Sequence, residues 1–199
     1  FFFNDTATTE SYTRALLDAR PIYLTLNLSN TFGIYAASGP LTVADAPLIY
    51  PFLSDAEVMS NLDQEPIEDP DEVSSRVAAQ VDQMVAGDAA YWCIRHTGSG
   101  AFLGYCEFID IDKRHDRAEI RFVCDRKGWG QGFGAEAVSA LLAHGASSGL
   151  KSLVASTHVG DNRAEHLLHK LGFKAEGYLK GAVHRDGERR DRRLYALDL

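Results

Sequence analysis

Residues Glu119–His144 read EIRFVC, DRKGWGQGFG and AEAVSALLAH, the pattern of a strand, a glycine-rich turn and a helix in immediate succession. Glycines alternate with larger residues in the turn, at positions 128, 130, 132 and 134. No Cβ atom screens their backbone N–H groups, and the first turn of the helix adds N–H groups without an intrahelical acceptor. The stretch therefore predicts an anion-binding turn whose expected ligand is phosphate.

The composition is that of an acidic chain without a membrane-spanning segment. Its 199 residues are 45% hydrophobic, which suits one domain with a sizeable core, and its net charge is −8. General nucleic-acid binders need clustered cations to displace counterions, so no nucleic-acid partner is expected. No apolar stretch approaches the roughly 20 residues of a membrane span, so no membrane partner is expected either. Negative charge suits a cationic acceptor or a basic peptide, although it also serves solubility alone.

The three cysteines, Cys93, Cys106 and Cys124, lie far apart in segments that read as strands. They form no CxxC pattern. We therefore interpret them as buried, reduced thiols and expect a cytoplasmic location.

The N-terminal residues 1–22, FFFNDTATTESYTRALLDARPI, differ in composition from the rest and show no clear hydrophobic period. They closely resemble the translated read-through of a sequencing adapter. We interpret residues 1–22 as a non-native extension and expect residues 23–199 to form a single domain.

Hydrophobic periodicity and capping residues predict the order helices, meander, helix, strand, helix, hairpin. A first strand is expected at 22–28, followed by an irregular stretch through Gly39 and Pro40. The expected helices cover 43–53, 54–62, 71–86 and 134–147, and a further helix is capped by Asp161 or Asn162 and ends at Gly172. The expected strands cover 90–96, 101–111, 117–124, 152–157, 174–184 and 192–199.

Two familiar phosphate-binding motifs fit the glycine turn poorly. A Walker A loop ends in Gly-Lys-Ser/Thr, whereas this turn ends in Gly-Ala-Glu, which excludes it. Gly130, Gly132 and Ala135 match the dinucleotide pattern GxGxxG/A, but that fold needs an acidic residue about 20 positions later. The corresponding segment, KSLVAST, contains no carboxylate.

The turn instead resembles the pyrophosphate loop of the GNAT acetyltransferase superfamily, Arg/Gln-x-x-Gly-x-Gly/Ala. The matching residues are Trp129, Gly130, Gln131, Gly132, Phe133 and Gly134, followed by Ala135. Trp129 replaces the usual Arg or Gln, which removes one side-chain donor. PLTVADA, AEIRFV and the tail from KLGFKAEGYL to LYALDL are similar to further family segments, so the resemblance covers about residues 40–199. The tail looks most like the branch that includes ribosomal-protein N-terminal acetyltransferases.

Resemblance to this family implies an α+β fold: a mixed, mostly antiparallel sheet flanked by helices and split near its fourth and fifth strands. It implies acetyl-CoA as the co-substrate, no metal, and a primary amine as the acceptor, either a small molecule or a protein N-terminus. The amine attacks the thioester directly. A catalytically silent acyl-CoA-binding or regulatory module is the alternative function.

The resemblance also assigns site residues. Glu119 occupies the strand position where the family often has a carboxylate facing the acceptor, and it is the leading candidate for the base; Glu107 and His158 are reserves. Backbone N–H groups near Phe122, Val123 and Cys124 are expected to stabilise the thioester oxygen. Asn162 either contacts the pantetheine arm or caps its helix.

Several assignments stay open at this point. The positions where many relatives have a Tyr or a Ser as proton donor hold Leu168 and Ala164, which leaves His166, His169 or solvent for that role. The segment HRDGERRDRR either binds phosphate or adenine or forms a solvated charge cluster at a hairpin tip. Four aromatic residues either line an acceptor pocket or pack in the core: Tyr91, Trp92, Phe102 and Tyr105. The acceptor and the oligomeric state, including a homodimer, are undetermined.

Overall fold

The computed structural model of this protein describes residues 26–27, 36–60, 62–96, 99–185 and 187–199. The interpreted extension, residues 1–22, and most of the strand expected at 22–28 lie outside these ranges. Only Leu26–Asn27 of that strand is described, as β1. Among the described residues, none of the helices is both long and apolar enough to cross a membrane.

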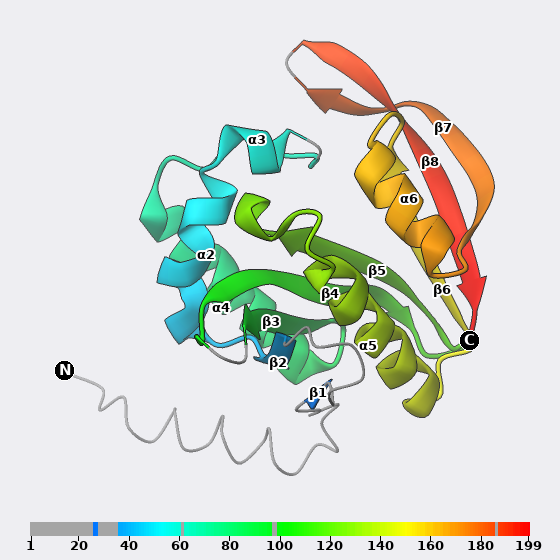
Figure 1. The fold of residues 1–199 in the computed structure, drawn as a ribbon, viewed down its shortest axis with the longest axis horizontal. Helices are drawn as coiled ribbons and strands as arrows, with labels where there is room; N and C mark the ends of the chain where they lie inside the picture. The colour runs from blue at the N-terminus through cyan, green and yellow to red at the C-terminus, as the bar shows by residue number, and fades with distance from the viewer. Residues whose placement is uncertain (1–25, 28–35, 61, 97–98, 186) are drawn as a thin grey trace.

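The fold is a mixed sheet with helices on both faces, as the α+β expectation required (Figure 1). The described strands follow the order β1-β2-β3-β4-β5-β6-β8-β7, and only β5 and β6 pair in parallel. The strands are β1, β2 (Ala36–Pro40), β3 (Ala90–His96), β4 (Phe102–Asp112), β5 (Arg117–Cys124), β6 (Ser152–His158), β7 (Lys174–Arg185) and β8 (Glu188–Asp198). The helices are α2 (Ala46–Leu53), α3 (Ala56–Met59), α4 (Pro70–Ala86), α5 (Phe133–Ser147) and α6 (Asn162–Lys170), with 3-10 turns η1 (Val43–Asp45) and η2 (Arg126–Gly128).

Local signals explain the helix boundaries, as α4 illustrates. The Asp69 side chain accepts a hydrogen bond from the Asp71 N–H, and Pro70 occupies the first turn, where its missing N–H costs nothing. Val73 and Val77 are fully buried against the sheet. Gly87, with φ +75°, ends the helix in the left-handed conformation that glycine favours.

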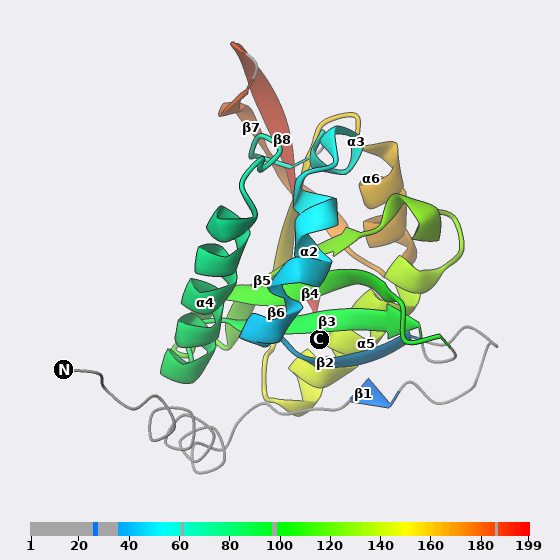
Figure 2. The same cartoon turned by 90° about the vertical axis from the view of Figure 1, so that its left-hand side faces the viewer.

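Two hydrophobic clusters lie on opposite faces of the sheet. One packs α5 and α6 against β3–β6 through residues such as Leu141, Leu153 and Leu168. The other packs α2 and α4 against the opposite face through residues such as Leu53 and Val77. Figure 2 shows α2 and α4 on one side of the sheet and α5 and α6 on the other.

The sheet is split between β5 and β6, the fourth and fifth strands of the family pattern. The two strands pair only where Arg117–Glu119 lies beside Ser152–Val154. Farther along, β5 continues to pair with β4, and β6 with β8. Because N–H groups alternate in direction along a strand, alternate N–H groups of residues 120–124 face the gap. The expected split is confirmed.

Two local expectations are wrong. An irregular stretch was expected from residue 29 through Gly39 and Pro40; its part up to residue 35 lies outside the described residues, and Ala36–Pro40 is strand β2, all five residues of which pair with β3. Pro40 is tolerated because it ends the strand. The helix expected over 54–62 is only α3, because tertiary contacts use the carbonyl groups that follow it. Arginines of the β7–β8 hairpin donate to the carbonyl oxygens of Met59, Ser60 and Leu62.

Candidate active site

The glycine turn lies between the end of β5 and the start of α5. Gly130 and Gly132 have φ angles of +74° and +90°, which glycine adopts without the steric cost that a Cβ imposes. No side chain caps α5 at Gly132, so the N–H groups of its first turn need an acceptor from outside the helix. The helix dipole favours an anion at this end. The backbone therefore forms the cradle that the sequence predicts.

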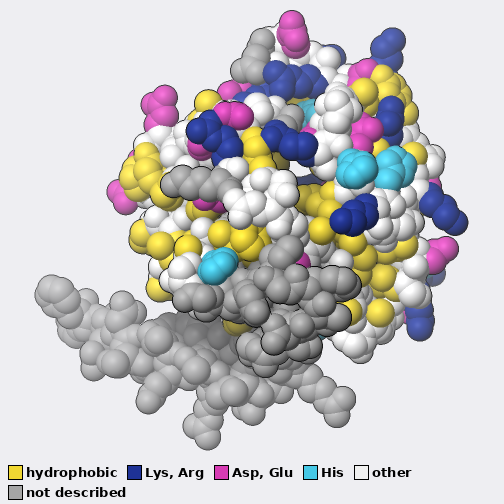
Figure 3. All heavy atoms as spheres, viewed as in Figure 1, with side chains coloured by type: hydrophobic (Ala, Val, Ile, Leu, Met, Phe, Trp, Pro, Cys, Tyr) yellow, Lys and Arg dark blue, Asp and Glu magenta, His cyan; other side chains and the backbone are white. Residues whose placement is uncertain are grey.

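A cavity of about 720 Å³, here called the donor cavity, extends from this turn into the gap between β5 and β6. Its lining includes Phe122, Val123, Cys124, Trp129, Gly130, Gly132, Gly134, Ala135 and Asn162, all predicted donor-site residues. Two other predicted residues lie outside the lining: Gln131 is exposed, and Phe133 is buried with its ring edge-on to His96. Figure 3 shows a hollow on this face with basic and histidine side chains around it.

The donor cavity is lined by more cations than anions. Its charged residues are Arg76, Arg121, Arg163, Lys170 and Arg192 against Asp63, Glu107 and Asp161. The Arg163 guanidinium carbon lies 3.4 Å from the centroid of the Trp129 ring, a cation–π contact. The Trp129 Nε1–H donates to the Cys124 carbonyl oxygen at 3.0 Å, which fixes the indole. Trp129 thus holds a guanidinium beside the turn although its own side chain is uncharged.

A second cavity of about 1080 Å³, here called the acceptor cavity, lies between α4 and the sheet. Residues 64–69 of the α3–α4 loop, one face of α4 and parts of β3, β4 and β5 line it. Gln64, Arg76, Glu107 and Arg121 line both cavities. The two cavities therefore meet at these four side chains.

Glu107, on β4, is the buried acid at this junction. It is 9% exposed, and no hydrogen bond from a described residue reaches its carboxylate. Burial raises the pKa of Glu107 above its ordinary value, although Arg121 and Arg76 act in the opposite direction. A carboxylate whose pKa is raised is a stronger base than an ordinary one, and this carboxylate lies where the two cavities meet.

Glu119, the leading candidate from the sequence, lies on β5 on the same face. Its Oε1 accepts a hydrogen bond from the Arg121 Nε at 2.8 Å. It is absent from the described lining of either cavity, whereas Arg121 lines both. Its role as the base stays a prediction, and the contact that the structure shows for it is with Arg121.

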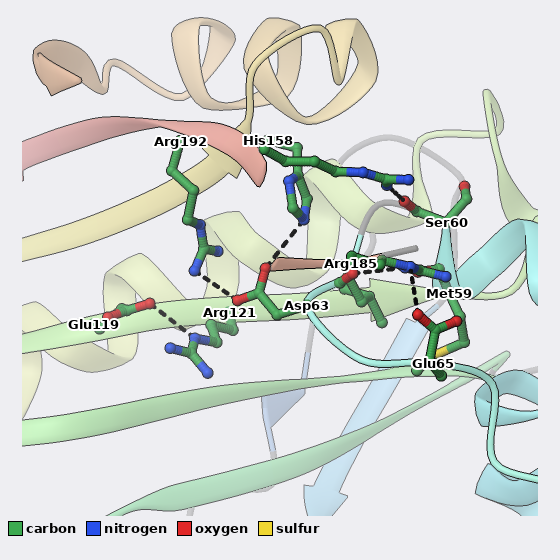
Figure 4. A network of polar contacts seen from close by, with 11 residues as sticks. Met59, Ser60, Asp63, Glu65, Glu119, Arg121, His158, Arg185 and Arg192 are labelled. Atoms are coloured by element: carbon green, nitrogen blue, oxygen red, sulfur yellow. Dashed lines mark hydrogen bonds and ion pairs between the residues drawn. The ribbon is translucent and has the colours of Figure 1, made fainter. Parts of the chain in front are cut away.

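Residues 62–69, here called the roof, line the two cavities around their junction, and residues of β6 and the β7–β8 hairpin hold them in place. Figure 4 shows Asp63 between His158 and Arg192. The His158 Nε2 and the Arg192 Nη1 lie 3.0 and 2.7 Å from the two Asp63 carboxylate oxygens. Arg185, only 6% exposed, donates to the Leu62 carbonyl oxygen at 2.7 Å. The roof therefore depends on residues more than 90 positions away in the sequence.

The arginines of HRDGERRDRR make contacts that neither expectation for this segment includes. Arg185, Arg190 and Arg192 contact the α3–α4 segment, Arg189 donates to the Gly181 carbonyl oxygen, and Arg193 pairs with Glu165. Those contacts are structural. Of these five arginines Arg192 alone also lines the donor cavity, together with Arg163 and Lys170 of α6.

The remaining candidates are also placed. Leu168 and Ala164 line the donor cavity without offering a proton, His166 lines it and is exposed, and the His169 ring lies edge-on to Tyr195. Asp161 caps α6, accepting from the Ala164 N–H at 3.1 Å. The aromatic residues divide: Tyr91 lines the acceptor cavity, Tyr105 lines the donor cavity, Trp92 is in the core, and Phe102 packs on Phe52.

One lining residue carries no signal in the sequence. Thr157, on β6, is 7% exposed and lines the donor cavity. Its hydroxyl has no hydrogen-bond partner within the described part of the chain. A lone threonine in a short buried strand does not differ from a core residue in sequence.

Comparison with known proteins agrees with this geometry. A family model described as an acetyltransferase (GNAT) domain matches residues 39–174. The chain belongs to the GNAT acetyltransferase family. One relative of this GNAT chain, the uncharacterized N-acetyltransferase p20 of Bacillus licheniformis, is 28% identical over 158 residues, or 79% of this chain and 89% of p20. Another, the uncharacterized N-acetyltransferase YoaA of Bacillus subtilis, is 25% identical with the same coverage.

Solved structures share the GNAT fold. The ribosomal L7/L12 alpha-N-protein acetyltransferase RimL superimposes with a TM-score of 0.79 at 18% identity, covering 89% of this chain and 95% of RimL. Spermidine N-acetyltransferase from Vibrio cholerae, in complex with CoA and spermine, gives 0.74 at 20% identity, covering 82% and 95%. The resemblance to the branch that includes ribosomal-protein acetyltransferases is thus confirmed for the fold.

Proposed function

We propose that this GNAT protein transfers the acetyl group of acetyl-CoA to a primary amine by direct attack. The observation that carries the proposal is the junction. A basic cavity with a glycine-rich anion cradle meets a second cavity at a buried carboxyl group, Glu107. The first cavity suits an anionic donor, and the second leaves room for an acceptor beside the same carboxyl group.

The donor cavity fits acetyl-CoA in charge and in backbone geometry. Bound acetyl-CoA supplies the activated acetyl thioester. The first-turn N–H groups of α5 and the positive-φ glycines Gly130 and Gly132 would hold its pyrophosphate. Arg163 and Lys170 add positive charge at the cavity mouth. Asn162 and Thr157 line the path toward the gap, where they would contact the pantetheine arm.

The acceptor must lose protons, because amines titrate near 8 or 10 and attack only in the neutral form. We assign the proton-accepting role to Glu107, directly or through one water, since it lines both cavities. The amine nitrogen forms the new bond to the acetyl carbon, the bond from that carbon to sulfur breaks, and the second amine proton passes through water to the sulfur. Alternate N–H groups of residues 120–124 stabilise the negative charge on the acetyl oxygen. Glu119 orients Arg121 beside Glu107.

Thiol release with a panel of primary amines tests the transferase activity. Tight CoA binding without turnover of any amine would favour the silent module, which Leu168 and Ala164 at the usual proton-donor positions keep as the second candidate.

Two isosteric variants separate the acids. Glu107→Gln should lower kcat about 100-fold or more while leaving the affinity for acetyl-CoA within about twofold. Glu119→Gln removes the partner of Arg121 and should cost less, with the pH–rate profile retained. If Glu119→Gln instead abolishes the acidic limb of the profile and Glu107→Gln does not, Glu119 is the base.

A further inference from the structure

The acceptor cavity differs from the donor cavity in the sign of its charge. Its lining has two arginines, Arg76 and Arg121, against seven acidic residues: Glu65, Glu68, Asp69, Glu72, Asp88, Glu107 and Asp110. A cavity with this excess of carboxylates attracts cations and repels acidic peptides. Because both arginines lie at the junction with the donor cavity, the outer part of the acceptor cavity is acidic throughout.

Its inner end holds a carboxyl group that accepts no hydrogen bond from the described residues. Glu107 is only 9% exposed and lines the cavity, and its carboxylate receives no hydrogen bond from a described residue. Its oxygens are not among the enclosed polar atoms without a partner in the described residues, so they are open to the cavity and to a ligand. A ligand amine at this position would supply the missing donor.

Four carboxylates of the outer part are exposed and available. Glu68 on the loop, Glu72 in the first turn of α4, Asp88 just after α4, and Asp110 on β4 form no ion pair with a described residue. Two other acids are already engaged: Glu65 lies 3.6 Å from Arg185, and Asp69 caps α4. The free carboxylates come from four separate segments around one cavity.

We propose that the acceptor is an aliphatic di- or polyamine, with its reacting amine at Glu107 and a second, protonated amine held by the outer carboxylates Glu68, Glu72, Asp88 and Asp110. This inference rests on the proposed acetyl transfer. A monoamine leaves the outer carboxylates unused, and a protein N-terminus offers a single amine followed by uncharged backbone. A molecule with two amines separated by methylene groups matches both ends of the cavity.

The test compares 1,4-diaminobutane and spermidine with 1-aminobutane, and with a peptide bearing a free N-terminus, by initial rates of thiol release at saturating acetyl-CoA. At a separation of about 7 Å in water-like dielectric, each carboxylate contributes roughly a two- to threefold preference for the second charge. We expect kcat/KM for the di- and triamine to exceed that for 1-aminobutane by about tenfold or more at low salt. The ratio should shrink as sodium chloride screens the charges.

The triple variant Glu68→Gln, Glu72→Gln, Asp110→Asn should reduce that ratio by about tenfold. Asp82→Asn is the matched control: Asp82 is exposed on the same helix, outside the cavity lining, and its loss should leave the ratio unchanged. Equal kcat/KM for mono- and diamine without salt dependence, or a preference for the peptide, overturns the inference while acetyl transfer stands. Absence of thiol release with every amine overturns the transfer itself and the inference with it.

Discussion

Replacing Gly104 by alanine should damage the donor cavity through the backbone of its wall. Gly104 lies on β4 opposite Cys124 of β5, and its φ of +147° is rare for other residues. A Cβ there would lie 2.0 Å from the Val123 carbonyl oxygen and 2.9 Å from the Cys124 Cα. Non-bonded atoms normally stay about 3.5 Å apart, so the strands must separate by roughly 1 Å or more.

Two costs follow from this separation. Overpacking against a neighbouring backbone costs about 1–3 kcal/mol. Nearby hydrogen bonds, such as the one from the Asp125 N–H to the Leu103 carbonyl oxygen at 2.7 Å, each contribute a further 0.5–1.5 kcal/mol, roughly. We therefore expect the free energy of unfolding to fall by about 2–5 kcal/mol. Because Val123 and Cys124 line the donor cavity, the KM for acetyl-CoA should also rise roughly tenfold, or about 1.4 kcal/mol.

Urea unfolding at low temperature and steady-state kinetics measure the two effects. Gly145→Ala is the matched control, since the three nearest atoms to its Cβ would be side-chain atoms of Phe108, Leu199 and Leu150, at 3.2–3.4 Å. It should change the free energy of unfolding by at most about 1 kcal/mol and leave the KM for acetyl-CoA unchanged. A Gly104→Ala protein as stable as the original, with the same KM, would refute the argument that β4 positions the end of β5.

Three further changes test the site. Arg163→Ala removes the cation held on Trp129 and should raise the KM for acetyl-CoA about two- to tenfold at unchanged kcat; an unaltered KM would exclude a donor contact. Because burial raises the pKa of Glu107, its charged form destabilises the folded protein as pH rises through that pKa. In thermal unfolding at pH 8, Glu107→Gln should therefore have a higher melting temperature than the original protein. This difference should disappear below the ordinary carboxyl pKa of 4.5, where the carboxyl group is protonated in both the folded and the unfolded protein. An equal difference at pH 4 would contradict the prediction. Arg185→Met leaves carbonyl groups of the α3–α4 loop unpaired and should lower the free energy of unfolding in urea by about 2–4 kcal/mol. Arg189→Met, on the exposed part of the hairpin, should lower it by less than about 0.5 kcal/mol. Equal losses would refute the argument that Arg185 holds the α3–α4 loop in place.

Features encoded within a few residues were predicted well from the sequence. The helix expected at 71–86 is α4, which begins one residue earlier at Pro70 and ends at Gly87 as expected, and the glycine turn leads into α5 as expected. Strand β2 was missed because Gly39 and Pro40 locally oppose strand formation. Its existence depends on pairing with β3, which lies more than 50 residues away and overrides the local preference.

The choice between the two acids illustrates what sequence does not contain. Glu107 and Glu119 lie on adjacent strands and on the same face of the sheet. The alternation of side chains along a strand therefore does not distinguish between them. The register places Glu107 opposite Arg121 and Glu119 opposite Ile109. Only the positions of α4 and the 62–69 loop put the first of them in a cavity, and those positions are set by tertiary contacts.

The donor and acceptor cavities differ in how far apart in the sequence their residues lie. The donor cradle is built from one continuous stretch, from the end of β5 through the start of α5, and α6 completes the donor cavity. Its anion-binding role could therefore be predicted from the sequence. The acceptor cavity is assembled from a loop, a helix and three strands, with its roof held by Arg185, Arg192 and His158 from the far end of the chain. Substitutions at the exposed acids of that loop and of α4 leave every contact of the cradle in place. Acceptor preference can consequently change without loss of donor binding, which is why the acceptor must be inferred from the charge of the assembled cavity and not from a motif.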